Sequence, residues 1–364
     1  MTTFFRGACA SLTLGAGVVL AGCGGGGSGL PRPTSTPVPG TTATPTPSGT
    51  SNGSGPITAN QLVFVSTRSG SSEIYKANAD GSNAVQLTTI GRTMGLPIEK
   101  PSVSPDGRRI VFQFGKPATG GTDNLEIAVI NTDGTGFRQL TTDTTAAGRP
   151  DDYSPVFSAD NRYIFWTSQR ATTNSDRVPH IFRMDGAPGN AGGNPIQLVV
   201  EPSLSPSVNS TGNTLAYIAR DQATSPITIQ PLSNGALSGT ARRIGGNVSG
   251  GSLFNLALSP DGTRVAFSTV QSIPSGAMTT TSVPASLSIL NVATGASIGT
   301  ASGGTSNGGS AWSRDSQTLY FDAAGGTTAN RQIFALDAPF SAAPRQITTD
   351  AQGANFSPSF LSGS

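Results

Sequence analysis

The stretch Ser104-Pro105-Asp106-Gly107-Arg108-Arg109-Ile110-Val111-Phe112 joins a proline-led turn to a short apolar strand. The turn returns as Ser259-Pro260-Asp261-Gly262, and altered copies begin at Ser158 and Ser313. Aligning the apolar triplets places one more copy at Ser205, with a longer loop, so successive serines lie 54, 47, 54 and 54 residues apart. A unit repeated at this spacing predicts an array of similar supersecondary units.

Each unit continues with a second apolar strand, a tight-turn pair and a last short strand. In the second unit these are Glu126-Ile127-Ala128-Val129, Asp133-Gly134 and Gln139-Leu140-Thr141. Asp-Gly pairs accept the positive φ that hairpin turns require, and no window after residue 57 has a convincing helical period. With the short segment before each proline-led turn, the unit is four antiparallel strands. Such units repeated around an axis make a β-propeller.

The first unit begins at Gln61-Leu62-Val63-Phe64 and lacks the strand that should precede it. That strand is found near the other end of the chain, where Pro358-Ser359-Phe360 matches Pro101-Ser102-Val103 and Pro202-Ser203-Leu204. We therefore predict an all-β fold over residues 58–364. It is a six-bladed β-propeller of four-stranded antiparallel blades, closed by the C-terminal strand, which completes the first blade.

Residues 1–22 have the order of an export signal, with Arg6 ahead of a small and apolar stretch from Ala8 to Ala21. The ending Leu20-Ala21-Gly22-Cys23 resembles the lipobox of bacterial lipoproteins. The resemblance implies that Cys23 becomes the lipidated first residue of the mature protein. The alternative is an ordinary secretory leader followed by a chance cysteine.

Residues 23–57 are predicted to form a disordered tether, because Gly, Ser, Thr and Pro dominate and cannot bury enough apolar surface. An O-glycosylated stalk has the same composition and is the alternative. Gly24 follows the cysteine where Asp would retain a lipoprotein at the inner membrane. The lipoprotein resemblance therefore implies an exported, lipid-anchored protein at the outer membrane, periplasmic or surface-facing, if the cell is Gram-negative.

Composition argues against several classes of site. A net charge of +2 with 12% charged residues gives no field for nucleic acid. Both cysteines lie in the first 23 residues, and His180 is the single histidine, so we predict no metal site, no cofactor and no catalytic set. The sequence Gly304-Thr305-Ser306-Asn307-Gly308 fits a nucleophile-elbow formula but lacks the strand-turn-helix context, and we interpret it as a chance match.

One set of residues could bind a ligand. Basic residues follow the apolar triplet of four units and should gather on one face of the ring, namely Arg68, Lys116, Arg170 and Arg220. We predict that this basic arc holds an acidic partner, such as a carboxylate peptide tail or an anionic glycan. The alternative is a structural role, in which these cations pair with acids and carbonyls of the propeller. Long loops at 114–124, 168–179 and 271–286 fit either a binding surface or tolerated variation.

The recurring Pro-Ser-Val-Ser-Pro-Asp-Gly-Arg-Arg-Ile-Val-Phe from Pro101, followed by Ile-Ala-Val-Ile-Asn-Thr-Asp-Gly and Gln-Leu-Thr, resembles the repeat of the TolB-type propeller family. The α/β domain that precedes the propeller in TolB has no counterpart here, so the partnership of TolB with the peptidoglycan-associated lipoprotein is not carried over. We expect a monomeric, lipid-anchored envelope module that binds a protein or cell-wall ligand without catalysis. The alternative is a glycan or peptide hydrolase or lyase that uses Asp and Glu residues of the central channel.

Overall fold

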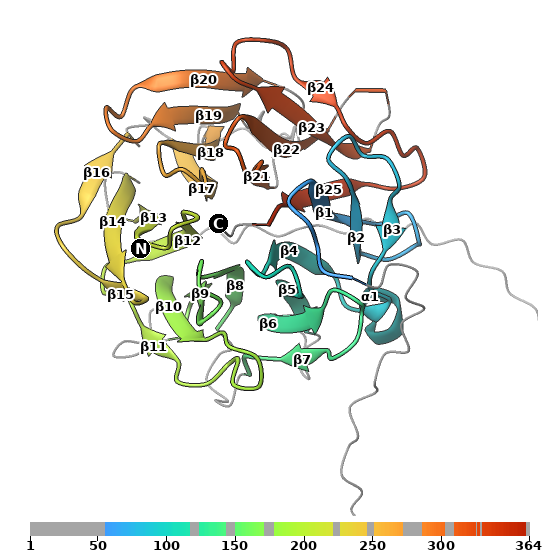
Figure 1. Ribbon diagram of the computed structural model, residues 1–364, viewed down its shortest axis with the longest axis horizontal. Coiled ribbons are helices and arrows are strands. Elements are labelled where there is room, and N and C mark those ends of the chain that lie inside the picture. Colours follow the sequence, from blue (N-terminus) through green and yellow to red (C-terminus); the bar gives the residue numbers. More distant parts are fainter. Residues whose placement is uncertain are drawn as a thin grey trace, which may run out of the picture. The chain divides into compact units, whose positions relative to one another are not determined.

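The computed structural model describes residues 55–116, 124–142, 150–170, 178–220, 226–245, 251–271, 286–302, 309–324, 326–327 and 330–361. In these residues, six sheets stand around a common axis (Figure 1). The leader, Cys23 and the tether up to Ser54 lie outside them, as does the match at residues 304–308.

The first three sheets are four-stranded blades. From the axis outward, the first holds β25 (Asn355–Ser359), β1 (Gln61–Ser66), β2 (Glu73–Asn78) and β3 (Val85–Gln86). The second holds β4 (Ile98–Val103), β5 (Arg109–Lys116), β6 (Asn124–Asn131) and β7 (Arg138–Gln139). The third holds β8 (Asp152–Phe157), β9 (Tyr163–Ser168), β10 (His180–Asp185) and β11 (Ile196–Gln197).

The fourth blade contains one strand more than predicted. It holds β12 (Ser203–Val208), β13 (Thr214–Ala219) and β14 (Ile227–Ser233), and β14 pairs with both β15 (Ala236–Leu237) and β16 (Arg242–Ile244). The fifth holds β17 (Gly251–Leu258), β18 (Arg264–Gln271), β19 (Ser286–Asn291) and β20 (Ser297–Ser302). The sixth holds β21 (Ser310–Trp312), β22 (Thr318–Ala324), β23 (Arg331–Asp337) and β24 (Arg345–Gln346).

The predicted closure of the ring is confirmed. Strand β25 pairs antiparallel with β1, with Val63 opposite Ser359 and Val65 opposite Phe356. The C-terminal strand is thus the innermost strand of the first blade (Figure 1). Both ends of the ring are joined within one sheet, so backbone hydrogen bonds hold them together.

The proline-led turn is held by its own side chains. Ser104 Oγ accepts a hydrogen bond from Arg109 N (2.9 Å) and donates one to Asp106 Oδ1 (2.6 Å). Gly107 has φ 68°, the left-handed conformation that glycine adopts without steric cost. The serines at 158, 259 and 313 make the same pair of contacts. The motif is therefore a folding element in each of these blades.

The alignment of Ser205 with these serines was wrong. In the fourth blade the turn begins at Asn209, whose Oδ1 accepts from Thr214 N (3.0 Å) as the serine hydroxyl does elsewhere. Ser207 and Val208 face Ala216 and Leu215, so Pro206, not Pro202, begins the segment equivalent to Pro101-Ser102-Val103. An asparagine oxygen accepts the same hydrogen bond as a serine oxygen. Because the residue type differs, the sequence alignment of the fourth unit was placed four residues too early.

Each of five innermost strands carries a bulge. Register shifts mark it, and one residue of each strand has a positive φ of 51–56°, namely Lys100, Ser154, Ser205, Asn255 and Ser357. Side chains of a neighbouring blade accept from three of these backbone N–H groups: Gln113 from Ser154, Thr167 from Ser205 and Asp322 from Ser357. The bulges therefore link adjacent blades around the axis.

The apolar core lies between blades. One cluster packs Val63 of the first blade against Phe112 of the second, and another packs Val111 of the second against Trp166 of the third. All four side chains are fully buried. The apolar triplets thus bury both faces of their strands.

A short helix was not expected. Helix α1 (Ile90–Met94) lies in the connection from β3 to β4, and Gly95 ends it in the left-handed conformation with φ 67°. Arg92 N in its first turn donates to Glu73 Oε1 (2.8 Å). Five residues are too few to show a helical period, so the pattern could not reveal it.

The two ends of the ring differ. The connection face is the end where the innermost strands begin, at Ile98 or Asp152, and where β5 ends at Lys116. The turn face is the opposite end and carries the turn at 104–107. The segment at 55–57 docks there, because Ile57 N donates to Gly107 O (2.7 Å).

Shortening the side chain of Phe360, which follows the closing strand β25, should weaken the packing between the first and sixth blades. Phe360 is 6% exposed, and its ring centre lies 4.6 Å from that of Tyr320 in the sixth blade. Phe360→Ala should lower the free energy of unfolding by about 3 to 5 kcal/mol, measured by urea denaturation. Leu237→Ala, at a side chain 38% exposed, should change it by about 0.5 kcal/mol or less. Equal losses in the two variants would show that the packing of Phe360 between the blades adds no stability.

Candidate binding site at the connection face

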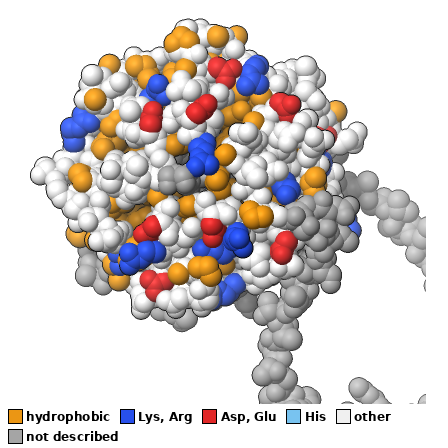
Figure 2. Space-filling model, viewed as in Figure 1, with side chains coloured by type: hydrophobic (Ala, Val, Ile, Leu, Met, Phe, Trp, Pro, Cys, Tyr) orange, Lys and Arg blue, Asp and Glu red, His pale blue; other side chains and the backbone are white. Residues whose placement is uncertain are grey.

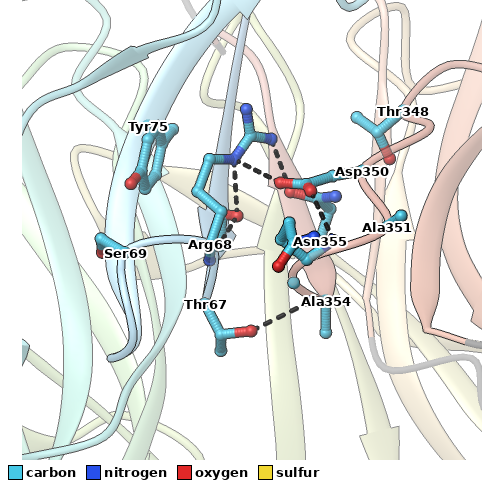
Figure 3. A network of polar contacts seen from close by, with 12 residues as sticks. Thr67, Arg68, Ser69, Tyr75, Thr348, Asp350, Ala351, Ala354 and Asn355 are labelled. Atoms are coloured by element: carbon cyan, nitrogen blue, oxygen red, sulfur yellow. Dashed lines mark hydrogen bonds and ion pairs between the residues drawn. The ribbon is translucent and has the colours of Figure 1, made fainter.

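Arg68 is held in a polar network at the connection end of the first blade. Its Nε lies 3.0 Å from both Asp350 Oδ2 and Ser66 Oγ, and its Nη2 donates to Asn355 Oδ1 (2.8 Å). Figure 3 shows the guanidinium turned toward Asp350 and Asn355, with Tyr75 beside it. The guanidinium carbon is 4.9 Å from the centre of the Tyr75 ring. Acceptors therefore surround much of this cation.

Arg170 makes the equivalent contacts in the third blade. It forms an ion pair with Asp152, its Nε donates to Ser168 Oγ (3.1 Å), and it lies over the Trp166 ring. The Asp152 side chain is only 2% exposed and also accepts from Trp166 Nε1 (3.0 Å). Asp152 and Asn355 occupy the same position of their strands, so the two arginines bind to one recurring acceptor position. These contacts match the structural alternative for both arginines.

Lys116 and Arg220 complete the predicted arc. Lys116 ends β5 opposite Asn124, and its side chain lies outside the described part of the structure. Arg220 is exposed, and its backbone N–H donates to Pro202 O (2.7 Å). Its guanidinium has no hydrogen bond or ion pair with any described residue. The structure thus places the four residues at the connection ends of four successive blades. The side chains of Arg68 and Arg170 are paired with acceptors, whereas that of Arg220 is exposed.

Lys100 is a central residue that the sequence interpretation did not single out. It stands at the bulge of β4, and its Nζ donates across the ring to Asn255 Oδ1 at the bulge of β17. Burial lowers the pKa of Lys100 to about 8, with Arg331 adding to the effect and Asp322 and Glu99 opposing it. Lys100 precedes Pro101 as Ser154 precedes Pro155. Because Lys100 and Ser154 hold the same position before this proline, the repeat alignment could have identified Lys100 as a residue of the innermost strand.

Asp322 anchors the sixth blade to the first. It is fully buried, and it accepts from Ser357 N (2.9 Å) and from Arg331 Nε (3.0 Å). Arg331 lies over the Phe356 ring with its guanidinium carbon 5.0 Å from the ring centre. A carboxylate bonded in this way serves as a structural acceptor.

Two cavities follow the axis. The mouth cavity, about 320 Å³, opens at the connection end of blades two to five and is lined by Lys100, Gln113, Tyr153, Ser154, Leu204, Ser205, Arg220, Leu253, Phe254 and Asn255. The axial cavity, about 160 Å³, is lined by the innermost strands of all six blades, including Lys100, Ser154 and Asn255. No Asp or Glu of the described residues lines either cavity.

Tyr153 lies in the wall of the mouth cavity. Burial raises its pKa to about 12, while the nearby positive charge of Arg220 opposes the shift and Asp151 adds to it. The hydroxyl is therefore neutral at pH 7 and available as a hydrogen-bond donor.

His180 Nδ1 lies 3.2 Å from the backbone oxygen of Glu201. Across the described ranges, no group of three or more His, Cys, Asp and Glu side chains is placed to hold a metal ion. Within the same ranges no helix has the length and apolar character needed to cross a bilayer.

Charge is evenly mixed on the face of the ring that Figure 1 presents. Blue and red side chains are interspersed there, and apolar side chains gather around the central hollow (Figure 2). The described side chains of this face therefore form no single-sign patch for an extended polyanion.

The repeats have relatives of known sequence. No family model matches the chain. Over 69 residues it is 42% identical to the Protein TolB homolog of Chlorobium chlorochromatii, and over 68 residues it is 41% identical to that of Chlorobaculum tepidum. The matched segment is 18% of this chain and 15% of each relative, so the chain spans only a small part of these proteins.

Solved structures share the fold. TolB from Acinetobacter baumannii matches with a TM-score of 0.59 and 15% identity, over 83% of this chain and 66% of that one. Hydrazine synthase from Kuenenia stuttgartiensis matches with a TM-score of 0.54 and 14% identity, over 85% of this chain and 47% of that one. The second is an enzyme by name, so the shared fold does not decide between binding and catalysis.

Because Arg170 is paired with a buried carboxylate and Arg220 is exposed, replacing each with alanine should lower the free energy of unfolding by different amounts. Arg170→Ala leaves the buried carboxylate of Asp152 without its cation and should lower the free energy of unfolding by about 1 to 3 kcal/mol. Arg220→Ala removes an exposed side chain and should cost about 0.5 kcal/mol or less. Urea midpoints of the two variants test this, and a larger loss at Arg220 would contradict the assignment.

Because of Lys100, the stability of the folded protein should change with pH in the alkaline range. Its folded pKa of about 8 lies below the unfolded value of 10.5, so between these values the unfolded chain binds more protons and stability rises with pH. From pH 8 to pH 10 the urea midpoint of the native protein should therefore shift upward relative to that of Lys100→Met. Parallel pH profiles for the two proteins would rule this out.

Proposed function

We propose that the chain is a non-catalytic binding module of the cell envelope, because it folds as a six-bladed β-propeller and part of its repeat region is similar to TolB homologues. Lipidated Cys23 holds it on a membrane, with the outer membrane as its place in a two-membrane cell. The connection face takes a protein or cell-wall ligand. The propeller serves as a rigid, monomeric scaffold for that face.

The observation that carries the proposal is the chemistry of the two cavities on the axis. Their described walls hold cations, hydroxyls, amides and apolar side chains, and no carboxylate. Acid and base catalysis on glycans needs two carboxyl groups about 5 to 9.5 Å apart. Among the carboxylates near the axis, Asp152 interacts with Trp166 and Arg170, and Asp322 interacts with Ser357 and Arg331. These features favour binding over the hydrolase or lyase alternative.

The course of the chain supports the choice of face. The segment at 55–57 docks on the turn face, where Ile57 N bonds to Gly107 O and Thr132 Oγ1 lies 3.4 Å from Gly55 O. The tether therefore joins the ring at the end opposite the connection face. Two or three acyl chains at about 0.8 kcal/mol per buried methylene would hold such a module permanently.

The four residues of the basic arc have different roles in the proposed binding. Arg68 and Arg170 shape the connection face through their contacts with Asp350, Asn355 and Asp152. Arg220 and Lys116 are the members through which the face would attract an acidic partner, because the exposed guanidinium of Arg220 is not engaged by described acceptors.

Site-specific photo-crosslinking in the native envelope tests the binding role. A crosslinking residue in place of Glu99, near the start of β4 at the connection face, should capture a partner, whereas one in place of Arg314, which is exposed on the turn face, should not. Equal capture from both faces, or none from Glu99, would contradict the proposal. In the same cells Cys23→Ser should move the protein from the membrane to the soluble fraction, and unchanged membrane retention would exclude lipid anchoring.

A further inference from the structure

We propose that the mouth cavity is a subsite for a carboxylate joined to an apolar group, as at the free carboxyl end of a peptide with an apolar last residue. This inference rests on the proposed binding function of the connection face. It assigns that face a chemical specificity, which the propeller fold alone does not.

Hydrogen-bond donors converge on the cavity from three blades. Arg220 follows β13, Tyr153 lies in β8 and Lys100 lies in β4. Neither the Arg220 guanidinium nor the Tyr153 hydroxyl donates a hydrogen bond to another described residue. The Arg220 charge lies close enough to Tyr153 to act on its ionisation. Arg220 can bind both oxygens of a carboxylate, and a neutral tyrosine hydroxyl can donate to one of them.

The wall beside these donors is apolar. Leu204 and Leu253 are buried, and Phe254 is half-buried, and all three line the cavity. A ligand that carries only charge would leave this surface without a partner. A side chain attached next to the carboxylate would cover it and gain the free energy of apolar burial.

Charge and size both restrict the ligand. The described lining of the mouth cavity contains two cations and no anion, so it favours a negative group. Its volume of about 320 Å³ is at the lower end of the range of about 300 to 1,000 Å³ for small-molecule sites. A chain end fits such a space, whereas an internal loop of a protein must bring two strands into it.

Calorimetry with synthetic peptides tests the subsite in the detergent-solubilised full-length protein. The probes are N-acetyl-Ala-Ala-Phe as the free acid, the same peptide as its C-terminal amide, and N-acetyl-phenylalanine. The free acid should bind at least tenfold more tightly than the amide, because only the acid offers a carboxylate to Arg220. Tighter binding of the tripeptide than of N-acetyl-phenylalanine would identify a polypeptide end as the source, and equal binding would identify a small free acid.

Two variants and a matched control locate the site. Arg220→Ala should weaken the free acid about tenfold and leave the amide unchanged, and Tyr153→Phe should weaken the acid by a smaller factor. Arg314→Ala removes the same charge from the turn face and should have no effect. Equal affinity for acid and amide, equal effects of Arg220→Ala and Arg314→Ala, or no binding of any probe would each overturn the subsite.

The subsite and the wider function fail separately. If Arg220→Ala leaves an envelope partner bound at the connection face, detected by crosslinking from a residue in place of Glu99, the face binds but the carboxylate subsite is wrong. If no partner crosslinks from that position in the native protein, the binding function itself is wrong.

Discussion

The ring depends on the backbone bulges of its innermost strands. At each bulge a non-glycine residue adopts positive φ, which costs free energy wherever the surroundings do not enforce it. Side chains of the adjacent blade enforce it in three places, where Gln113, Thr167 and Asp322 accept the bulge N–H groups. The same bulges place Lys100 and Asn255 opposite each other across the axis. One local distortion therefore both links the blades and lines the channel.

Structural features whose hydrogen-bonding partners lie in the same repeat unit could be predicted from the sequence. The Gln-Leu-Thr endings are an example, since Thr88 Oγ1 both donates to Glu73 and accepts from Ile74 N, and Gln86 bonds to Thr88 O. Thr141 and Thr348 repeat these contacts. The repeat alignment was wrong in the fourth blade because Asn209, and not a serine, accepts the hydrogen bond that holds the turn. Comparing residue types along the sequence does not reveal that the two side chains are equivalent.

The site was less predictable, because its contacts join distant parts of the chain. Repeat position put Arg68 and Arg170 on one face, but it gave no sign of Asp350 and Asn355 around Arg68. Those acceptors come from the last connection and from the closing strand. Lys100 was overlooked because its importance comes from its place at the centre of the ring, which is a property of the fold and not of its neighbours in the sequence.

The closing strand also affects how the molecule is made. Because β1 pairs with residues of β25 such as Ser359, the first blade stays incomplete during synthesis until β25, almost three hundred residues after β1, has emerged. Loop closure over that distance is slow, and until then β1 presents an unpaired edge that invites association with other chains.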